Sequence, residues 1–284
     1  MSHESWEFAE VERHLGKPYS SGDGYVIYCA DCLSSLQRLP DSLFALTVTS
    51  PPYNIGKEYE KPLDLDAYLN WCQQWMDEVY RTTGSAGAFW LNLGYVPVPG
   101  KAQALPLPYL LWQRCKFFLL QEVVWNYGAG VAARKTLSPR NEKLLWYVKD
   151  PDRYTFHLDA IRDPDVKYPR QKKNGKLRCN TLGKNPSDVW QIAKVTSGEG
   201  RASPERTPHP AQFPLDLIRR VVLGFSNPGD LVLDPFLGSG TVAASCVQHG
   251  RRVLGIEIKP EYCDIAARRV ERLLAARRSL LFPD

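Results

Sequence analysis

Apolar residues along the chain fall into two patterns: short continuous runs of strand length, and longer stretches in which they recur every three or four residues. The short runs predict seven strands, at residues 25–30, 43–48, 86–93, 117–125, 143–148, 231–233 and 252–256. The periodic stretches predict helices at residues 32–39, 65–81, 107–115, 212–224, 240–249 and 260–278. Strands that alternate with helices in this way are typical of an α/β fold with a mostly parallel sheet.

Polar or acidic residues stand close behind four of these strands. Asp31 follows the first strand and Ser50 the second, while Asp234 and Glu257 follow the sixth and the seventh. In open parallel sheets, ligands bind outside the carboxyl ends of the strands, where loops lead into helix N-termini. We therefore expect these four side chains to face one crevice.

The stretch LVLDPFLGSGTVAAS, residues 231–245, reads as a strand, an acidic residue, a glycine turn and a helix. Gly238 and Gly240 let the backbone approach a ligand closely, and the helix that follows presents unpaired N–H groups. The lysine of a triphosphate-binding loop is missing, whereas Gly238, Gly240 and Ala243 match the G-x-G-x-x-A spacing of a dinucleotide site. The glycine spacing alone therefore leaves a dinucleotide site open.

Asp234 argues against a dinucleotide, because its carboxylate would lie near the pyrophosphate and repel it. A cofactor with positive charge would be attracted, and S-adenosylmethionine carries both a sulfonium and an α-amino group. Glu257 can then accept hydrogen bonds from ribose hydroxyls. An acid that caps a tight turn would explain Asp234 or Glu257 separately, but not both with the glycine loop between them. The sequence therefore predicts an S-adenosylmethionine site.

The composition is that of an ordinary globular protein: the 284 residues are 44% hydrophobic and 24% charged. The opening residues are charged, and no apolar run reaches membrane-spanning length, so we expect no signal peptide, no membrane contact and a cytoplasmic location. Seven scattered cysteines argue against a disulfide framework. Cys29 and Cys32 form one C-x-x-C without a second pair, which favours free thiols over a metal site or a redox pair.

Basic charge is concentrated in one segment. Residues 167–206 hold ten basic and three acidic residues, so this stretch has a formal charge of +7. The whole chain has a net charge of +5, so the rest of the chain is slightly acidic. Its glycines and its scarcity of apolar runs indicate an exposed, loop-rich insertion. A solvated charged face is the simpler interpretation, but such concentration favours contact with nucleic acid. The residues that we expect to contact DNA are Lys167, Arg170, Lys172, Lys173, Lys176 and Arg178.

The pair of motifs TSPPY (49–53) and DPFLGSGT (234–241) resembles the catalytic and cofactor motifs of the amino-group DNA methyltransferases. Their order, with the catalytic motif first and a variable segment between them, resembles the β arrangement of bacterial restriction-modification enzymes. The stretches YCADC, HPAQFPLDLIRR and GRRVLGIEIKPEYCDIAARR also resemble parts of this family, so the likeness covers most of the chain. It implies a doubly wound, mostly parallel seven-stranded sheet.

The resemblance also implies a set of cofactor-binding residues. Asp31 is expected to touch the adenine amine, and Phe213 and Phe236 to pack beside the cofactor, although both phenylalanines also suit an ordinary core. His209 suits either the cofactor site or a cap on helix 212–224, and we favour the cap. The full cofactor set is Asp31, Phe213, Asp234, Pro235, Phe236, Gly238, Ser239, Gly240, Thr241 and Glu257.

The SPPY motif suits chemistry on an exocyclic amine, whose lone pair is delocalised into the ring and is therefore a poor nucleophile. Ser50 Oγ and the Pro51 carbonyl can accept hydrogen bonds from the amine, while Pro51 and Pro52 contribute no competing N–H. Tyr53 offers a flat face for an extruded base. Holding both amine hydrogens out of the ring plane would localise the lone pair toward the methyl group, mainly in the transition state. The predicted catalytic residues are thus Ser50, Pro51, Pro52 and Tyr53.

A serine at the first position of this motif resembles the N4-cytosine enzymes more than the N6-adenine enzymes. We therefore expect a DNA (cytosine-N4)-methyltransferase; an N6-adenine enzyme, an RNA methyltransferase and a silent DNA- or cofactor-binding module stay open as alternatives. The chain lacks the cysteine motif of enzymes that attack cytosine C5 covalently. Nothing in the sequence points to a metal ion.

These expectations divide the chain into four segments: an N-terminal arm (1–23), a catalytic half (24–150), a basic target-recognition insertion (151–206) and a cofactor-binding half (207–284). The expected partner is duplex DNA, for a monomer or homodimer in the bacterial cytoplasm near the nucleoid. The family also allows a cognate restriction endonuclease that forms no stable complex with the chain.

Overall fold

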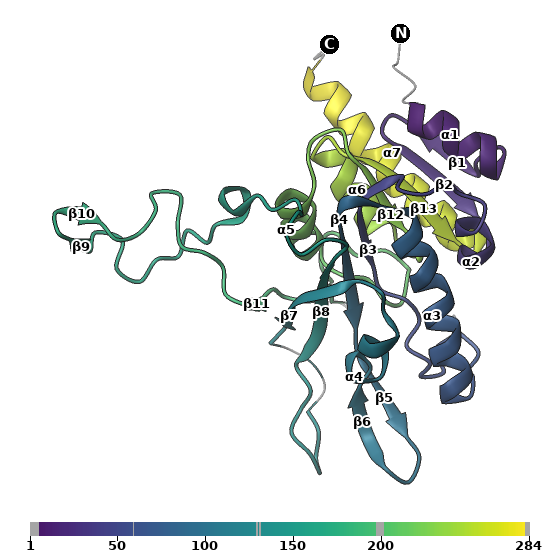
Figure 1. The fold of residues 1–284 in the computed structure, drawn as a ribbon, viewed down its shortest axis with the longest axis horizontal. Helices are drawn as coiled ribbons and strands as arrows, with labels where there is room; N and C mark the ends of the chain where they lie inside the picture. The colour runs from purple at the N-terminus through teal and green to yellow at the C-terminus, as the bar shows by residue number, and fades with distance from the viewer. Residues whose placement is uncertain (1–5, 59, 129, 131, 197–201, 282–284) are drawn as a thin grey trace.

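The predicted sheet is present and is extended at both edges. In the computed structural model, which describes residues 6–58, 60–128, 130, 132–196 and 202–281, nine strands pair in the order β1-β2-β13-β12-β3-β4-β8-β7-β11 (Figure 1). The predicted seven are β2 (Tyr25–Cys29), β13 (Arg252–Glu257), β12 (Leu231–Asp234), β3 (Phe44–Thr49), β4 (Thr83–Leu93), β8 (Asn141–Val148) and β7 (Phe118–Asn126). Strands β2, β13, β12, β3 and β4 are parallel, whereas β8 runs antiparallel to β4 and β7. The prediction of a mostly parallel seven-stranded sheet is confirmed.

Helices cover both faces of this sheet, so that the chain forms three layers (Figure 1). One face packs against α5 (Leu215–Phe225), α6 (Thr241–Gln248) and α7 (Pro260–Leu281). The other packs against α1 (Trp6–Leu15), α2 (Cys32–Leu36), α3 (Leu65–Thr82) and α4 (Pro108–Leu111). The doubly wound arrangement is therefore confirmed.

Side chains along each strand alternate between the two cores. In β12, Val232 joins the core under α5, α6 and α7, while Leu231 and Leu233 join the core under α2 and α3. A strand buried on both faces needs apolar residues at successive positions. This requirement explains why the strands appear in the sequence as continuous apolar runs.

Two short strands extend the sheet beyond the predicted seven. β1 (Ser20–Gly22) pairs antiparallel with β2, and β11 (Val189–Gln191) pairs parallel with β7. A separate hairpin of β5 (Tyr95–Val98) and β6 (Ala102–Pro106) follows β4. The predicted helix at 107–115 is shorter than expected, because α4 gives way to a 3₁₀ turn at Trp112–Arg114.

The basic segment leaves the body of the molecule. After a 3₁₀ turn at Leu158–Ile161, the chain runs outward to the small hairpin of β9 (Lys172–Lys173) and β10 (Lys176–Leu177), then returns to β11 (Figure 1). We call residues 162–187 the basic arm. Residues 1–5 of the predicted N-terminal arm and 197–201 of the predicted insertion lie outside the described residues. The four segment boundaries stay predictions.

Across the described ranges, no helix combines the length and the apolarity that crossing a bilayer requires.

Candidate functional site

A cavity of ≈ 960 Å³ opens at the carboxyl ends of the central strands. Asp31, Ser50 and Glu257 line it, as expected for residues that follow parallel strands. The other predicted residues that line it are Pro51, Pro52, Tyr53, Phe213, Pro235, Phe236, Gly238 and Ser239. The SPPY motif and the glycine loop thus share one cavity.

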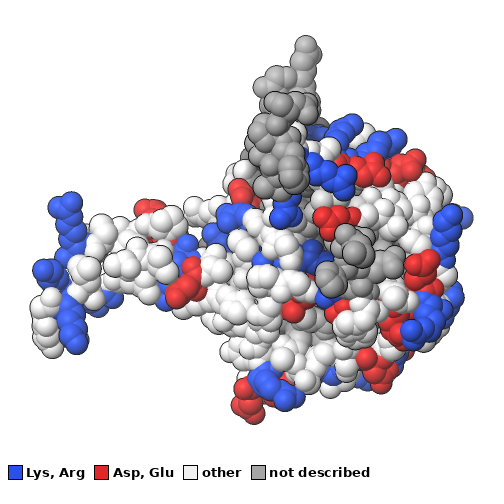
Figure 2. Space-filling view, turned by 90° about the horizontal axis from the view of Figure 1, so that it is seen from above, with Lys and Arg blue, Asp and Glu red and all other residues white. Residues whose placement is uncertain are grey.

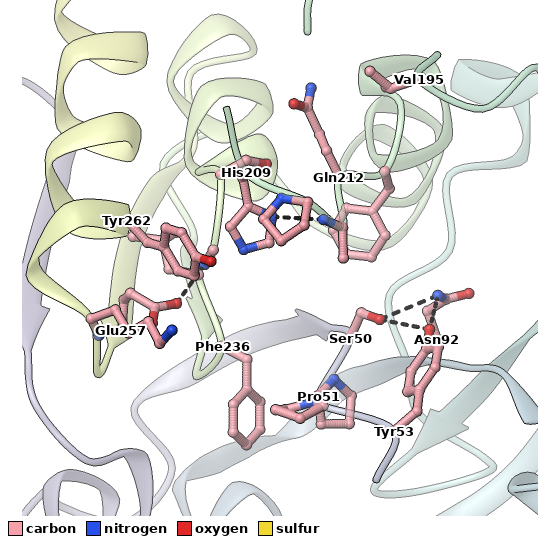
Figure 3. A pocket seen from close by; sticks show the side chains of 18 of the residues that line it. Ser50, Pro51, Tyr53, Asn92, Val195, His209, Gln212, Phe236, Glu257 and Tyr262 are labelled. Carbon is pink, nitrogen blue, oxygen red and sulfur yellow. Dashed lines mark hydrogen bonds between the residues drawn. The ribbon is translucent and has the colours of Figure 1, made fainter. Parts of the chain in front are cut away.

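Glu257 lines one side of this cavity and is held there by backbone donors. Its Oε2 accepts a hydrogen bond from the Gly238 N–H at 2.9 Å, and its Oε1 accepts one from the Lys259 N–H at 3.0 Å (Figure 3). Burial raises the pKa of the Glu257 carboxyl, while these backbone donors oppose the rise. Each oxygen can accept a further bond, which suits a ligand with two neighbouring hydroxyls.

The glycine loop needs glycine for two separate reasons. Gly238 and Gly240 have φ values of +49° and +73°, in the left-handed region. A Cβ on Gly240 would also lie 2.7 Å from the Ala266 Cβ of α7, too close for any side chain. The turn therefore brings the start of α6 close to α7.

Thr241 and Gly240 do not line the cavity but support its wall. The Arg269 guanidinium, from α7, lies 2.8 Å from Thr241 Oγ1 and 3.3 Å from the Ser239 carbonyl. It also pairs with Glu205 Oε2 at 3.1 Å, and that carboxylate accepts a bond from the Leu215 N–H at the start of α5. These bonds fix the glycine loop relative to two helices.

Asp234 is buried behind the cavity lining, with 1% of its surface exposed. Its Oδ1 accepts hydrogen bonds from Thr49 Oγ1 at 2.7 Å and from the Phe236 N–H at 3.1 Å. Burial raises its pKa to about 7. In this position Asp234 ties the end of β3 to the glycine loop, and its predicted attraction for a cationic ligand stays a prediction.

Phe236 and Trp71 contribute aromatic side chains to the cavity lining. The Phe236 ring packs edge-on against Trp71 and Trp75, with ring centroids 5.6 and 5.1 Å apart. Phe236 and Pro51 lie between Glu257 on one side and Ser50 on the other (Figure 3). Asp31 stands at the rim, where its carboxylate caps α2 through the Ser34 N–H at 2.9 Å.

His209 lines the cavity and does not cap α5. Its Nδ1 accepts a hydrogen bond from the Ala211 N–H at 3.2 Å, and its ring packs against Tyr262 with centroids 4.4 Å apart. Pro214 occupies the N-cap position of α5, so the capping interpretation of His209 was wrong. Burial lowers the pKa of His209 to about 4, and the ring is neutral near pH 7.

Ser50 and Tyr53 belong to a hydrogen-bonded cluster with Asn92 and Glu142, which the sequence did not single out; Figure 3 labels the first three of these residues. Ser50 Oγ lies 2.8 Å from the Tyr53 hydroxyl, which donates to Glu142 Oε2 at 3.0 Å. The Asn92 amide donates to Tyr53 and to Glu142, each at 2.7 Å, and lies 3.3 Å from Ser50 Oγ. All four residues line the cavity.

Asn92 and Glu142 reach this cluster from different strand ends. Asn92 lies near the carboxyl end of β4, beside β3, so the rule that selected Ser50 also applies to it. Glu142 lies near the start of β8, which runs antiparallel to β4 and therefore begins at the same edge. A search restricted to the ends of parallel strands does not include Glu142.

The basic residues predicted to contact DNA lie apart from the cavity. All six are exposed on the basic arm, and Figure 2 shows lysine and arginine side chains gathered at the tip of this projection. Other parts of the predicted insertion reach the cavity, since Lys194, Val195, Thr196 and Arg206 line it. The segment therefore has an outer and an inner portion.

Cys29 and Cys32 are free thiols, and Cys32 is buried at the start of α2. In the part of the chain that the structure describes, no group of three or more His, Cys, Asp or Glu side chains could hold a metal ion.

Sequence comparison finds one matching family and close relatives. The family model N6_N4_Mtase, described as DNA methylase, matches residues 44–268. The chain is 58% identical over 263 residues to the type II methyltransferase M.ScaI of Streptomyces caespitosus, covering 93% of this chain and 86% of that protein. It is 32% identical over 251 residues to the DNA adenine methyltransferase YhdJ of Escherichia coli strain K12, covering 85% and 81% respectively.

Solved structures share the same architecture. PvuII DNA methyltransferase (cytosine-N4-specific) superposes with a TM-score of 0.72 at 20% identity, over 93% of this chain and 95% of that one. A DNA modification methylase of Thermus thermophilus, TTHA0409, complexed with S-adenosyl-L-methionine, superposes with a TM-score of 0.60 at 25% identity, over 87% and 95%. The first likeness concerns the fold alone.

Proposed function

The chain belongs to the family of N6/N4 DNA methylases, and from this premise we propose that it transfers a methyl group from S-adenosylmethionine to the N4 amine of cytosine in duplex DNA. S-adenosylmethionine is the cofactor of this family. The relative M.ScaI is a type II methyltransferase, and we assign this chain to the same restriction-modification class. The observation that carries the proposal is one cavity shared by Ser50 and Glu257.

The residues that line the Glu257 side of the cavity fit S-adenosylmethionine. Glu257 keeps acceptor capacity for ribose hydroxyls beyond its two backbone donors. The aromatic faces of Phe236 and Trp71 lie in the same part of the cavity, where they can attract a sulfonium through cation–π contact. When bound, the cofactor supplies an electrophilic methyl group. Asp31 and Phe213, both in the lining, would complete its site.

The residues on the Ser50 side of the cavity are proposed to bind and orient the target amine. Ser50 Oγ accepts one amine hydrogen, and the two prolines add no N–H that could compete with it. We propose that an amine held in this way points its lone pair toward the Glu257 side of the cavity, past Phe236 and Pro51, whose side chains are labelled in Figure 3. Positioning of the two reactants supplies much of the rate enhancement in such a direct transfer.

Cytosine is proposed as the target because Ser50 occupies the first position of the SPPY motif. This position resembles that of the N4-cytosine enzymes, and its hydroxyl belongs to the cluster with Tyr53. The adenine alternative rests on YhdJ, which is named as an adenine enzyme at 32% identity. The name of M.ScaI states no base, so the relatives alone leave the choice open.

The basic arm is proposed to track the phosphates of duplex DNA while the target base leaves the stack to reach Ser50. A base inside a duplex cannot enter a cavity at the end of a sheet, so extrusion is required. Tyr53 is the proposed stacking partner of the extruded base. We further propose a cytoplasmic protein that acts near the nucleoid, as a monomer or homodimer, without a stable complex with a nuclease.

Modified-base sequencing of genomic DNA tests this function in cells. Bacteria that express the chain should acquire N4-methylcytosine at one short recurring sequence, while cells expressing Ser50→Ala should not. Acquisition of N6-methyladenine alone would transfer the assignment to adenine. An unmodified genome in cells with soluble protein would favour a silent binding module.

A further inference from the structure

Glu142 lies at the inner end of a chain of hydrogen bonds that begins at Ser50. Ser50 Oγ is 2.8 Å from the Tyr53 hydroxyl, and that hydroxyl is 3.0 Å from Glu142 Oε2. Glu142 lines the cavity and accepts a second bond, from the Asn92 amide, on the same oxygen at 2.7 Å. Its carboxylate is thus connected to the predicted amine acceptor through one tyrosine.

The ionisation of Glu142 determines the direction of every bond in this chain. An ionised carboxylate has no proton to donate, so Tyr53 must give its single hydroxyl proton to Glu142. The Tyr53 oxygen then accepts from Ser50 and, at 2.7 Å, from the Asn92 amide. Ser50 therefore donates its own proton inward to Tyr53. The Asn92 amide nitrogen also lies 3.3 Å from Ser50 Oγ, but its two hydrogens serve the shorter bonds to Tyr53 and Glu142, so Ser50 Oγ can accept from a donor in the cavity.

We infer that Glu142 is the positioning residue that makes Ser50 an acceptor for the target amine, and that it finally holds the proton which the amine loses. The inference rests on the proposed function and deepens it, because that function leaves open where this proton goes. Neither the SPPY motif nor the glycine loop contains a carboxylate that contacts Ser50 in the described residues.

The proton balance of this step closes within the chain. The amine nitrogen bonds the methyl carbon while the carbon–sulfur bond breaks and leaves its electron pair on sulfur. The amine proton passes to Ser50 Oγ, the Ser50 proton passes to Tyr53, and the Tyr53 proton passes to Glu142. The nitrogen keeps one hydrogen and one methyl group. The positive charge of the sulfonium and the negative charge of Glu142 are both lost.

The surroundings of Glu142 suit a proton acceptor. Burial raises the pKa of its carboxyl, which makes it a stronger base than an exposed glutamate, while bonds from Asn92 and Tyr53 and the charge of Lys194 oppose the rise. The Lys194 ammonium lies 5.4 Å from the centroid of the Tyr127 ring. Burial and, to a lesser extent, the charge of Glu142 raise the pKa of the Tyr127 hydroxyl. Below its pKa, Glu142 is protonated and the chain loses its fixed direction. The transfer rate should therefore rise with pH as Glu142 ionises.

The test is single-turnover methyl transfer by Glu142→Gln, measured from low to neutral pH with the full-length protein and duplex DNA. Glutamine keeps the shape but cannot take the proton, so we expect transfer to slow by about 10²–10⁴-fold. The rise of the transfer rate with pH should disappear in this variant, while its affinity for S-adenosylmethionine should stay within about threefold of the wild-type value. The matched control is Glu122→Gln, because Glu122 pairs with Lys143 at 3.6 Å on the neighbouring strand and does not line the cavity. Glu122→Gln should keep both the wild-type transfer rate and its rise with pH.

Tyr53→Phe provides a second variant that leaves Glu142 in place and interrupts the chain. It should also slow transfer, and it should raise the pKa of Glu142, read by difference infrared spectroscopy of the carboxyl, because a donor is lost. A Glu142→Gln protein with the wild-type transfer rate and an intact rise of that rate with pH, or a Glu142 titration unmoved by Tyr53→Phe, would overturn the inference. If the wild type instead methylates adenine, the cytosine proposal fails, while the ratio of variant to wild-type rates still decides the role of Glu142. A wild type that transfers no methyl group overturns both.

Discussion

Glu257 shows how burial and hydrogen bonding act together on one side chain. Its carboxylate holds two backbone N–H groups and has a raised pKa. In the proposed function the ionised form accepts hydrogen bonds from ribose hydroxyls, and protonation would remove part of this capacity. Affinity for S-adenosylmethionine should thus be full above the raised pKa of Glu257 and fall as the pH drops through it.

Calorimetric titration with S-adenosylmethionine at several pH values measures this effect. Glu257→Gln should bind more weakly at pH 8 by about 1.5–3 kcal/mol, the usual size of a hydrogen bond to a charged group. Its affinity should also change less with pH than that of the wild type. Glu261→Gln is the control, because Glu261 is exposed in the first turn of α7. If the affinity of Glu257→Gln for S-adenosylmethionine changed with pH as much as that of the wild type, Glu257 would not be the group responsible for the pH dependence.

Asp234 predicts a pH dependence of stability rather than of binding. Its folded-state pKa of about 7 lies above the ordinary value of 3.8 for a free carboxyl. Because the folded state holds the proton more tightly, the contribution of Asp234 is present below pH 4 and is lost as the pH rises through 7. The contribution of Asp234 to wild-type stability should therefore decline over this range.

Urea unfolding of Asp234→Asn at pH 5 and pH 8 tests this sign. Asparagine keeps an oxygen for Thr49 and Phe236 but does not titrate. The unfolding free energy of the variant, relative to wild type, should therefore be higher at pH 8 than at pH 5. An Asp216→Asn control, at an exposed position on α5, should show no such change. A constant difference between Asp234→Asn and wild type would contradict the account.

Single residues differ in how far the sequence reveals them. Ser50, Asp31 and Glu257 could be predicted, because each follows an apolar run that is a parallel strand. Glu142 could not, since its position depends on the antiparallel direction of β8, and the apolar run of β8 carries no sign of direction. The burial of Asp234 could not be predicted either, because the sequence pattern of an acid after a strand is the same whether the side chain lines a cavity or supports its wall.

Among the elements, the turn between β12 and α6 requires glycine at position 240 for two reasons, a positive φ and close packing against α7. Gly250, just past the end of α6, has the positive φ without the close packing and so allows the two effects to be separated. Both glycines have positive φ, +73° and +71°. A Cβ at Gly250 would meet nothing within 4 Å, whereas one at Gly240 would lie 2.7 Å from the Ala266 Cβ. Alanine at either position incurs the left-handed backbone cost of roughly 1–2 kcal/mol. Only Gly240→Ala should add an overpacking cost of about 1–3 kcal/mol.

The free energy of unfolding in urea, measured for both variants, separates the two costs. Gly240→Ala should be the less stable protein and should also bind S-adenosylmethionine more weakly, because the loop must move away from α7. Equal losses for Gly240→Ala and Gly250→Ala would mean that close packing of this loop against α7 has no energetic weight.

The central elements could be predicted from the sequence because burial on both faces imposes long apolar runs. Edge elements lack that signal: β1 is Ser-Ser-Gly, and β11 contributes Val-Trp-Gln with its outer residues exposed. The hairpin of β5 and β6 also stayed hidden, since its residues alternate irregularly and include prolines at 97 and 106. Pairing with a neighbour, rather than composition, makes these segments strands.

For the whole molecule, the distance between cavity and basic arm separates chemistry from DNA affinity. If the arm neutralises phosphates, each lost contact should reduce the slope of log affinity against log salt by roughly 0.9. Lys172→Ala/Lys173→Ala should therefore weaken binding to all duplexes alike. Arg178→Ala should lose about 1–3 kcal/mol on the true site alone if its guanidinium reads guanine.

Binding of these variants to specific and scrambled duplexes across a salt series checks this prediction. The control is Lys17→Ala/Lys116→Ala, two exposed lysines away from the arm. Cofactor affinity should be unchanged in every variant, since none of these residues lines the cavity. If the arm variants keep the wild-type salt slope and specificity, the arm is a solvated surface and DNA binds elsewhere.

The central claim is that one cavity brings a cytosine amine at Ser50 to a methyl donor held at Glu257. Mass spectrometry of nucleosides tests it most directly, after purified protein, S-adenosylmethionine and duplex DNA have reacted. The account predicts N4-methyldeoxycytidine from the wild type. Ser50→Ala should lose about 2–4 kcal/mol of transition-state stabilisation, and therefore transfer the methyl group more slowly, while it keeps its affinity for the cofactor. N6-methyldeoxyadenosine as the sole product, or a Ser50→Ala protein that transfers at the wild-type rate, would contradict it.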